Sequence, residues 1–237
     1  MNWNQLLDEA TRYLQEYIRV QTVNPPGNEI EGARFFKKIF DKESIPCQIF
    51  EPSPGRGSFL ATLKGSGKKK PILLLNHIDV VPAEKENWET DPFAGTIKDG
   101  YLYGRGALDD KSMGIVEMMA LLILKREKIP LGRDLLFLAT ADEETGGRWG
   151  VGWAMENVPP LRESEYALNE GGHVIINEQG KGERYEMSNG QKVIFQLQIK
   201  AKGTSGHASR PHPDNPNVKL LHALDGVIQW ETPFHIL

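Results

Sequence analysis

The sequence predicts an α/β fold in which a mainly parallel sheet is covered by helices and is followed by part of a smaller α+β domain. Two short segments, 71–76 and 134–141, are almost continuously apolar, as strands covered on both faces are. Residues 193–201 instead alternate between apolar and polar, which predicts a strand in a sheet with one apolar face. We therefore expect one domain over residues 1–189 and the start of a second over 190–237.

The first elements of the chain surround a proline-rich turn. Apolar residues recur at helical spacing over 3–18 and 30–40, which predicts two amphipathic helices joined at Asn24-Pro25-Pro26-Gly27. The next apolar segments, 45–50 and 58–63, are interrupted by polar residues, which is typical of strands at the edge of a sheet.

The remaining elements supply the centre of the predicted sheet. Segment 71–76 is the first predicted central strand, and Leu135–Thr140 and Tyr166–Leu168 are the second and third. The alternation of these strands with helical segments favours parallel pairing. The helices are predicted at Ser112–Lys125, with Ser112 as the N-cap, at 149–157 and at 215–230.

Composition and charge narrow the classes of function. The 237 residues include 28 basic and 32 acidic residues and carry a net charge of -4, without the basic excess that favours binding to nucleic acid or an anionic membrane. No apolar stretch spans a bilayer, and the charged N-terminus is not typical of a signal peptide. The single cysteine, Cys47, excludes an intrachain disulfide and a cysteine-based zinc site and favours the reducing cytoplasm. We expect a cytoplasmic protein with a small-molecule partner, no nucleic acid and no membrane.

A histidine and an aspartate follow the first central strand directly. Ligand-binding loops of α/β sheets lie at the carboxyl ends of parallel strands, which is where His77 and Asp79 are placed. In this His-x-Asp arrangement the carboxylate can accept a hydrogen bond from the imidazole and so orient a metal-binding histidine. A histidine with a purely structural role at the end of a strand would give the same pattern.

Carboxylates occupy three further positions of the same kind. Asp109 and Asp110 lie between a glycine-rich turn and a predicted helix, where they could also serve only as a helix cap. Glu143 and Glu144 follow the second central strand, so one glutamate could bind a metal while its neighbour takes a proton from water. The same acidic run would be unremarkable on a solvated surface. Glu170 follows the third strand. Imidazole together with several carboxylates suits zinc, cobalt or manganese, and a shared carboxylate permits a pair of ions.

Several motifs, in the same order, make the sequence similar to one family. The sequence resembles the two-zinc peptidases and amidohydrolases, which include aminoacylase, carboxypeptidase S, dipeptidases and succinyl-diaminopimelate desuccinylase. The resemblance covers nearly the whole chain. It lies in Asn76–Pro82, Trp88–Phe93, Tyr103–Lys111, Asp142–Gly147, Asn169–Gly171 and Gly206–Ser209.

The resemblance implies a role for each candidate residue. It implies that two divalent ions, zinc in the family, are held by His77, Asp109, Glu144 and Glu170, with Asp109 as the bridge between them. It makes Glu143 the general base, Asp79 the residue that orients His77, and the Asp109–Asp110 peptide bond cis. It also makes residues 190–237 a lid and dimerisation domain whose His207 polarises the scissile carbonyl, often in the site of a partner subunit, so that a homodimer is expected.

One departure from the family pattern affects the expected activity. The family takes a sixth ligand, a histidine, from a segment after the lid, and His235 lies too early to match it. The resemblance therefore predicts a truncated chain that holds at most one metal tightly.

Three functions remain open from the sequence. The first is a metal-dependent hydrolase of exopeptidase or dipeptidase type, which cleaves amide bonds of a small peptide through a metal-activated water. The second is a deacylase or desuccinylase of an N-acyl amino acid. The third is an inactive remnant with an interaction role, in which the edge of strand 193–201 pairs with another chain.

Overall fold

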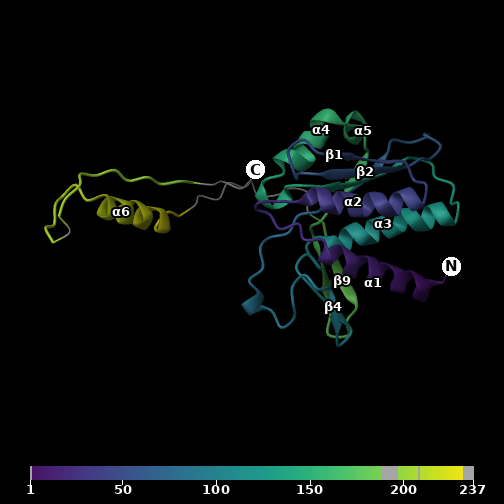
Figure 1. Cartoon of the computed structure of the whole chain (residues 1–237), viewed down its shortest axis with the longest axis horizontal. Coiled ribbons are helices and arrows are strands. Elements are labelled where there is room, and N and C mark those ends of the chain that lie inside the picture. Colours follow the sequence, from purple (N-terminus) through teal and green to yellow (C-terminus); the bar gives the residue numbers. More distant parts are fainter. Residues whose placement is uncertain (1, 188–196, 208, 232–237) are drawn as a thin grey trace. The chain divides into compact units, whose positions relative to one another are not determined.

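A computed structural model describes residues 2–187, 197–207 and 209–231 of the chain. The chain divides into two compact units, Met1–Glu186 and Met187–Leu237 (Figure 1). All the predicted metal-binding residues belong to the first unit, whereas His207 belongs to the second.

The first unit contains a five-stranded mixed sheet in the order β1-β2-β6-β3-β7. Strands β3 and β7 run parallel to β6 and to each other, and β2 is antiparallel to both β6 and β1. The α/β class is therefore confirmed, with a mixed sheet in which β2 alone runs against the other four strands. The strands are β1 Cys47–Phe50, β2 Ser58–Leu63, β3 Ile72–His77, β6 Leu135–Thr140 and β7 Tyr166–Leu168.

Two predictions about strand position were wrong. Strand β2, expected at an edge, lies between β1 and β6, and all its residues except Thr62 are buried. Its polar start is compatible with burial because the Ser58 hydroxyl accepts a hydrogen bond of 3.0 Å from the backbone amide of Ala141. Strand β7, expected in the centre, is the last strand at the β3 side of this sheet within the described residues, and its side chains are exposed.

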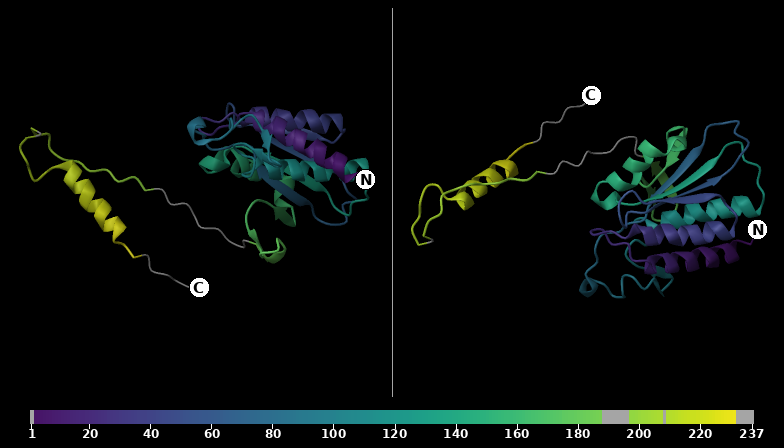
Figure 2. Two further views of the ribbon diagram at one scale, coloured as in Figure 1. Left: turned by 90° about the horizontal axis from the view of Figure 1, so that it is seen from below. Right: turned by 45° about the horizontal axis from the view of Figure 1, so that its top comes forward.

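Helices cover the two faces of the sheet (Figures 1 and 2). Helices α1, α2 and α3 lie on one face, where Phe36, Phe40, Phe59 and Phe137 form the centre of a large apolar core. Helices α4 and α5 lie on the other face, over a smaller core that includes Leu138. The bounds of these helices are α1 Trp3–Arg19, α2 Glu29–Lys42, α3 Lys111–Arg126, α4 Trp153–Asn157 and α5 Pro159–Arg162.

Helix ends differ from the predictions in two places. Helix α3 begins at Lys111 after Asp110, and Ser112 is not its N-cap, because the Ser112 hydroxyl donates to the carbonyl of Leu108 one turn earlier. The predicted helix 149–157 is a π-helical turn, Arg148–Gly152, followed by α4. The break is at Gly150, whose backbone leaves the helical conformation and lies so close to the Ala141 carbonyl that a Cβ would overlap it.

Smaller elements complete the two units. The first unit has two hairpins that the sequence did not predict, β4 Thr96–Lys98 with β5 Tyr101–Tyr103, and β8 His173–Ile176 with β9 Gly182–Glu186. It also has short 3-10 turns at Lys85–Asn87 and Glu143–Thr145. In the second unit the predicted helix is confirmed as α6, Pro216–Ile228.

The predicted strand at 193–201 lies partly outside the described residues. Its described part, 197–201, is not a strand, so the interaction role proposed for its edge has no structural support. None of the helices in the described ranges has the length and hydropathy to cross a bilayer.

Replacement of Phe36 by alanine tests the aromatic core. Phe36 is fully buried, and its ring centroid lies 4.9 Å from that of Tyr17 and 5.0 Å from that of Phe137. We expect Phe36→Ala to lower the free energy of unfolding by about 3–5 kcal/mol, because the cavity cannot close among these rings. Urea denaturation measures the loss, and Val116→Ala, at an exposed position of α3, is the control. Equal losses for the two variants would contradict the packing described.

Candidate metal centre

The predicted metal-binding residues lie at one edge of the sheet, where the parallel strands end. His77 is the last residue of β3, and Glu144 lies in the 3-10 turn that follows β6. Glu170 comes two residues after β7, and Asp109 directly precedes the N-cap of α3. Parallel strands place their carboxyl ends together, so residues far apart in the sequence meet at this edge.

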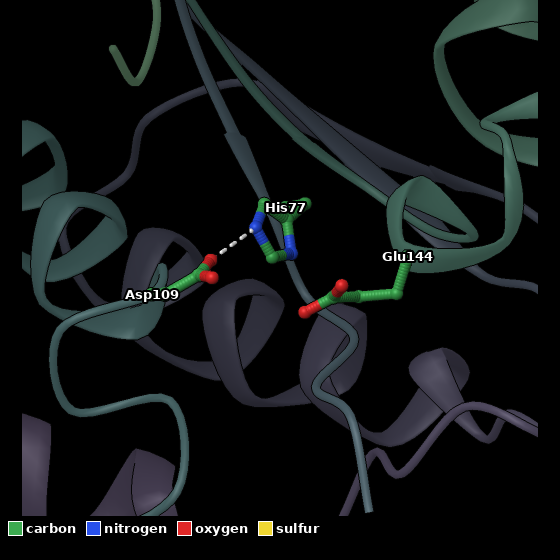
Figure 3. Close-up of side chains that lie close together, drawn as sticks. All are labelled: His77, Asp109 and Glu144. Carbon is green, nitrogen blue, oxygen red and sulfur yellow. Dashed lines mark hydrogen bonds and ion pairs between the residues drawn. The ribbon is translucent and has the colours of Figure 1, made fainter. Parts of the chain in front are cut away.

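His77 is the centre of two overlapping groups of side chains. Its Nε2 atom lies 2.9 Å from Oδ1 of Asp109 and 3.4 Å from Oε2 of Glu170. Figure 3 shows the imidazole between the carboxylates of Asp109 and Glu144. The ligand atoms of His77, Asp109 and Glu144 lie within 4.8 Å of one another, and so do those of His77, Asp110 and Glu170. The structure therefore brings the four predicted ligands together, while their binding of metal remains a prediction.

Asp110 is a member of this cluster that was not among the four predicted ligands. It is buried, and its Oδ2 atom lies 3.4 Å from the backbone amide of His77, which donates to it. Burial raises the pKa of Asp110 to about 7, although the nearby charge of His77 lowers it in part. The Asp109–Asp110 peptide bond is cis, as the resemblance implied. The sequence places both aspartates before the helix, but only the fold shows that Asp110 is buried and Asp109 exposed.

Asp79 connects the histidine to the acidic turn. Its carboxylate is fully buried and accepts hydrogen bonds from the backbone amides of Glu143, at 3.1 Å, and Glu144, at 3.0 Å. The Nδ1 atom of His77 lies 3.6 Å from Oδ1 of Asp79 and 2.9 Å from its backbone carbonyl oxygen. Burial opposes ionisation of Asp79, but the nearby imidazole of His77 and hydrogen bonds from Asn24 and the Glu144 amide outweigh it and lower its pKa. An ionised Asp79 therefore holds the turn that carries both glutamates.

A buried polar network behind Asp79 was not predicted from the sequence. Asn24 donates to Oδ2 of Asp79 at 2.7 Å and accepts from Arg56 at 3.1 Å. Arg56 also donates to Glu29 at 2.6 Å, and Glu29 accepts from the backbone amide of Asp142 at 3.2 Å. Hydrogen bonds thus connect the proline-rich turn at residues 24–27 to the turn that carries Glu143 and Glu144. The sequence identifies Asn24 only as a turn residue, because its partners Arg56 and Asp79 lie 32 and 55 positions away.

The electrostatics of the cluster favour a bound cation. Burial alone would lower the pKa of His77, but the nearby carboxylate of Asp79, with the charges of Asp110 and Glu170, raises it to about 10. Partial burial, together with neighbouring carboxylates, also raises the pKa values of Glu143 and Glu144. Several carboxylates that crowd one imidazole are stabilised by added positive charge. This nitrogen and oxygen donor set fits a divalent ion of the zinc, cobalt or manganese type.

His207, predicted to act on the substrate, belongs to the second unit. Its Nδ1 atom lies 2.7 Å from the hydroxyl of Ser209, and its carbonyl accepts from the backbone amide of Arg210 at 2.9 Å. The imidazole is exposed. Its role toward a substrate remains a prediction.

Comparison with known proteins identifies the family. The model of peptidase family M20/M25/M40 matches residues 73–226, so the chain belongs to this family. The resemblance stated from the motifs is thereby confirmed.

Individual relatives agree with this assignment. Human aminoacylase-1 is 30% identical over 220 residues, which cover 91% of this chain and 52% of the relative. The M20 family metallo-carboxypeptidase Sso-CP2 from Sulfolobus solfataricus matches with a TM-score of 0.62 and 24% identity, over 73% of this chain and 39% of that one. Bacillus subtilis YXEP, described as a dinuclear metal-binding M20 peptidase, has a TM-score of 0.51 and 18% identity. The match covers 70% of this chain and 43% of that one. The chain spans about half the length of the curated relative it matches.

Proposed function

We propose that the protein to which this chain belongs is a metal-dependent hydrolase that cleaves amide or peptide bonds of small substrates. The observation that carries this proposal is the cluster at the sheet edge, in which His77 is surrounded by Asp109, Glu144 and Glu170. Glu143 lies directly beside this cluster, in the same turn as Glu144. Membership of a peptidase family supports the proposal.

The proposed ligands of two divalent ions are His77, Asp109, Glu144 and Glu170, with Asp109 shared between the ions. The grouping of His77 with Asp109 and Glu144 supports one site, and the similarity to a dinuclear peptidase favours a second. We propose zinc, while cobalt and manganese suit the same donors. When bound, such ions supply Lewis acidity and make water a stronger nucleophile at neutral pH.

The proposed role of Glu143 is to move protons. As general base it takes a proton from the attacking water, and it then donates that proton to the nitrogen of the leaving group. Its raised pKa brings the carboxyl closer to the pH at which it exchanges protons efficiently. Because the base must be ionised, we expect activity to fall as the pH decreases through this raised pKa. Asp79 orients the turn through the amides of Glu143 and Glu144.

Two classes of substrate fit this chemistry. The first is a small peptide, cleaved in the manner of an exopeptidase or dipeptidase. The second is an N-acyl amino acid, and the similarity to aminoacylase-1 favours it. Assays of the whole protein, loaded with zinc, against a panel of dipeptides and N-acyl amino acids test both, with the same protein stripped by a chelator as the control. Hydrolysis that requires the metal is expected, whereas a fully loaded protein that cleaves neither class would contradict the proposal.

The second unit has a proposed role of its own. We propose that residues 1–189 form the catalytic domain and that residues 190–237 belong to a lid, which also forms a homodimer. The motif from Gly206 to Ser209 supports this assignment. We further propose a cytoplasmic location, supported by the single cysteine.

Replacement of His207 by alanine tests the proposed lid residue. We expect kcat to fall about 10²–10³-fold, as for loss of one donor to a developing oxyanion, with little change in KM or in metal content. His222→Ala, at an exposed position of α6, is the matched control. An unchanged kcat for His207→Ala would mean that His207 is an exposed loop residue without a role in catalysis.

A further inference from the structure

A buried carboxyl group lies about two helix turns beyond Asp110 on α3, and the proposed mechanism does not use it. Glu117 of α3 is only 7% exposed, and within the described part of the chain its carboxyl forms no ion pair. Its one hydrogen-bond partner there is Asn76 of β3, whose Nδ2 atom donates to Oε2 of Glu117 at 2.8 Å. Asn76 is 1% exposed. Two elements of the site are thus joined by a contact that excludes water.

The second oxygen of each side chain has no hydrogen-bond partner among the residues that the structure describes. These two buried atoms are Oε1 of Glu117 and Oδ1 of Asn76. If Glu117 were ionised, both atoms would be acceptors without a donor, and a negative charge would be buried without a cation. Both conditions are strongly unfavourable in a protein interior.

The close packing of α3 against β3 leaves little room for another hydrogen-bond donor near Oδ1 of Asn76. Gly114 lies three residues before Glu117 on α3, and a Cβ at this position would come within 2.8 Å of Oδ1 of Asn76. The absent side chain therefore allows the helix to approach β3 closely. A proton on Oε1 of Glu117 would supply the donor that Oδ1 of Asn76 lacks.

We propose that Glu117 is a neutral carboxylic acid that forms a cyclic, doubly hydrogen-bonded pair with the carboxamide of Asn76. The pair joins β3, which ends at His77, to α3, which begins immediately after Asp109 and Asp110. Glu117 is therefore a positioning residue that fixes His77 relative to Asp109. This positioning role rests on the proposed metal centre, whereas the protonation of Glu117 does not.

The charges around Glu117 agree with a neutral acid. Burial raises its pKa to about 8, the hydrogen bond from Asn76 lowers it in part, and the negative charge of Asp110 raises it further. A pKa above the ordinary value of 4.5 in the folded protein means that the folded state retains a proton that the unfolded state loses. The stabilisation is complete below pH 4.5, is lost progressively as the pH rises to about 8, and does not change further above that.

The test compares the wild-type chain with Glu117→Gln in the absence of metal. Glutamine keeps the size of the side chain and can form the same cyclic pair at every pH, because it offers one donor and one acceptor. We expect the urea midpoint of the wild type to fall relative to that of Glu117→Gln between pH 4.5 and about 8, and the difference to become constant at higher pH. Glu127→Gln, at an exposed residue after the same helix, is the control and should follow the wild type. If the urea midpoints of the wild type and Glu117→Gln change in parallel with pH, the proposal is overturned.

A direct titration does not depend on the stability of any variant. In the full chain labelled with ¹³C at glutamate carboxyl groups, the Glu117 resonance is assigned by its absence from Glu117→Gln. We expect it to titrate near pH 8. Titration near the ordinary glutamate value would overturn the proposal.

The positioning role has a separate readout, the affinity for zinc alone. We expect Glu117→Ala to bind zinc about tenfold more weakly or worse, as for other partners that orient metal ligands, and Glu117→Gln to restore normal affinity. Unchanged affinity in Glu117→Ala would overturn the positioning role. If the wild type itself binds no zinc, the proposed function fails, while the titration of Glu117 still decides the pair.

Discussion

Replacement of Glu143 by glutamine is expected to reduce turnover about 10²–10⁴-fold and to leave the metal content unchanged. Glutamine has the same shape but cannot accept a proton from water. The turn itself should persist, because it is held through the backbone amides of Glu143 and Glu144, which both donate to Asp79. Turnover of a small amide substrate and elemental analysis of the same sample measure the two effects.

Glu144→Gln is the matched control for this prediction. Glu144 lies next to Glu143 in the same turn, but its carboxylate belongs to the group around His77. We expect Glu144→Gln to lose metal as well as activity. If Glu143→Gln loses as much metal as Glu144→Gln, the division of roles between the two glutamates is wrong.

Replacement of His77 by alanine should have the largest effect on metal binding. Both groups of candidate ligands share His77, and it supplies their only nitrogen donor. We expect zinc affinity to fall by more than the roughly 10–100-fold typical of losing a residue that only orients a ligand. The remaining carboxylates repel one another without a cation, which should weaken the site further.

Competition with a chromophoric chelator measures this loss. His173→Ala is the control, because His173 is an exposed histidine of the same unit and pairs with Glu186 away from the cluster. A His77→Ala variant that retains zinc as tightly as His173→Ala would exclude His77 as a ligand.

The parts of the fold that the sequence predicted are those governed by local patterns. Helices α1 and α2 and strands β3 and β6 follow from the spacing of apolar residues within each segment. The meeting of His77 with Glu144 could also be anticipated, because each follows a strand, and parallel strands end at the same edge.

The features that the sequence did not predict depend on contacts between distant segments. The interior position of β2 results from its pairing with β6, and Ser58 is compatible with burial there because its hydroxyl accepts a hydrogen bond from Ala141. The support of Asp79 by Asn24 and the pairing of Asn76 with Glu117 likewise join different elements. Polar residues of these types are most often exposed, so their burial could be recognised only once their partners were known.

Anomalous diffraction at the zinc absorption edge, from crystals grown with zinc, tests the proposed centre most directly. The expected result is anomalous density about 2.0–2.2 Å from Nε2 of His77 and from a carboxylate oxygen of Asp109, with Glu144 or Glu170 as a further ligand. Zinc bound elsewhere, with no density between His77 and these carboxylates, would contradict a metal centre at this edge of the sheet.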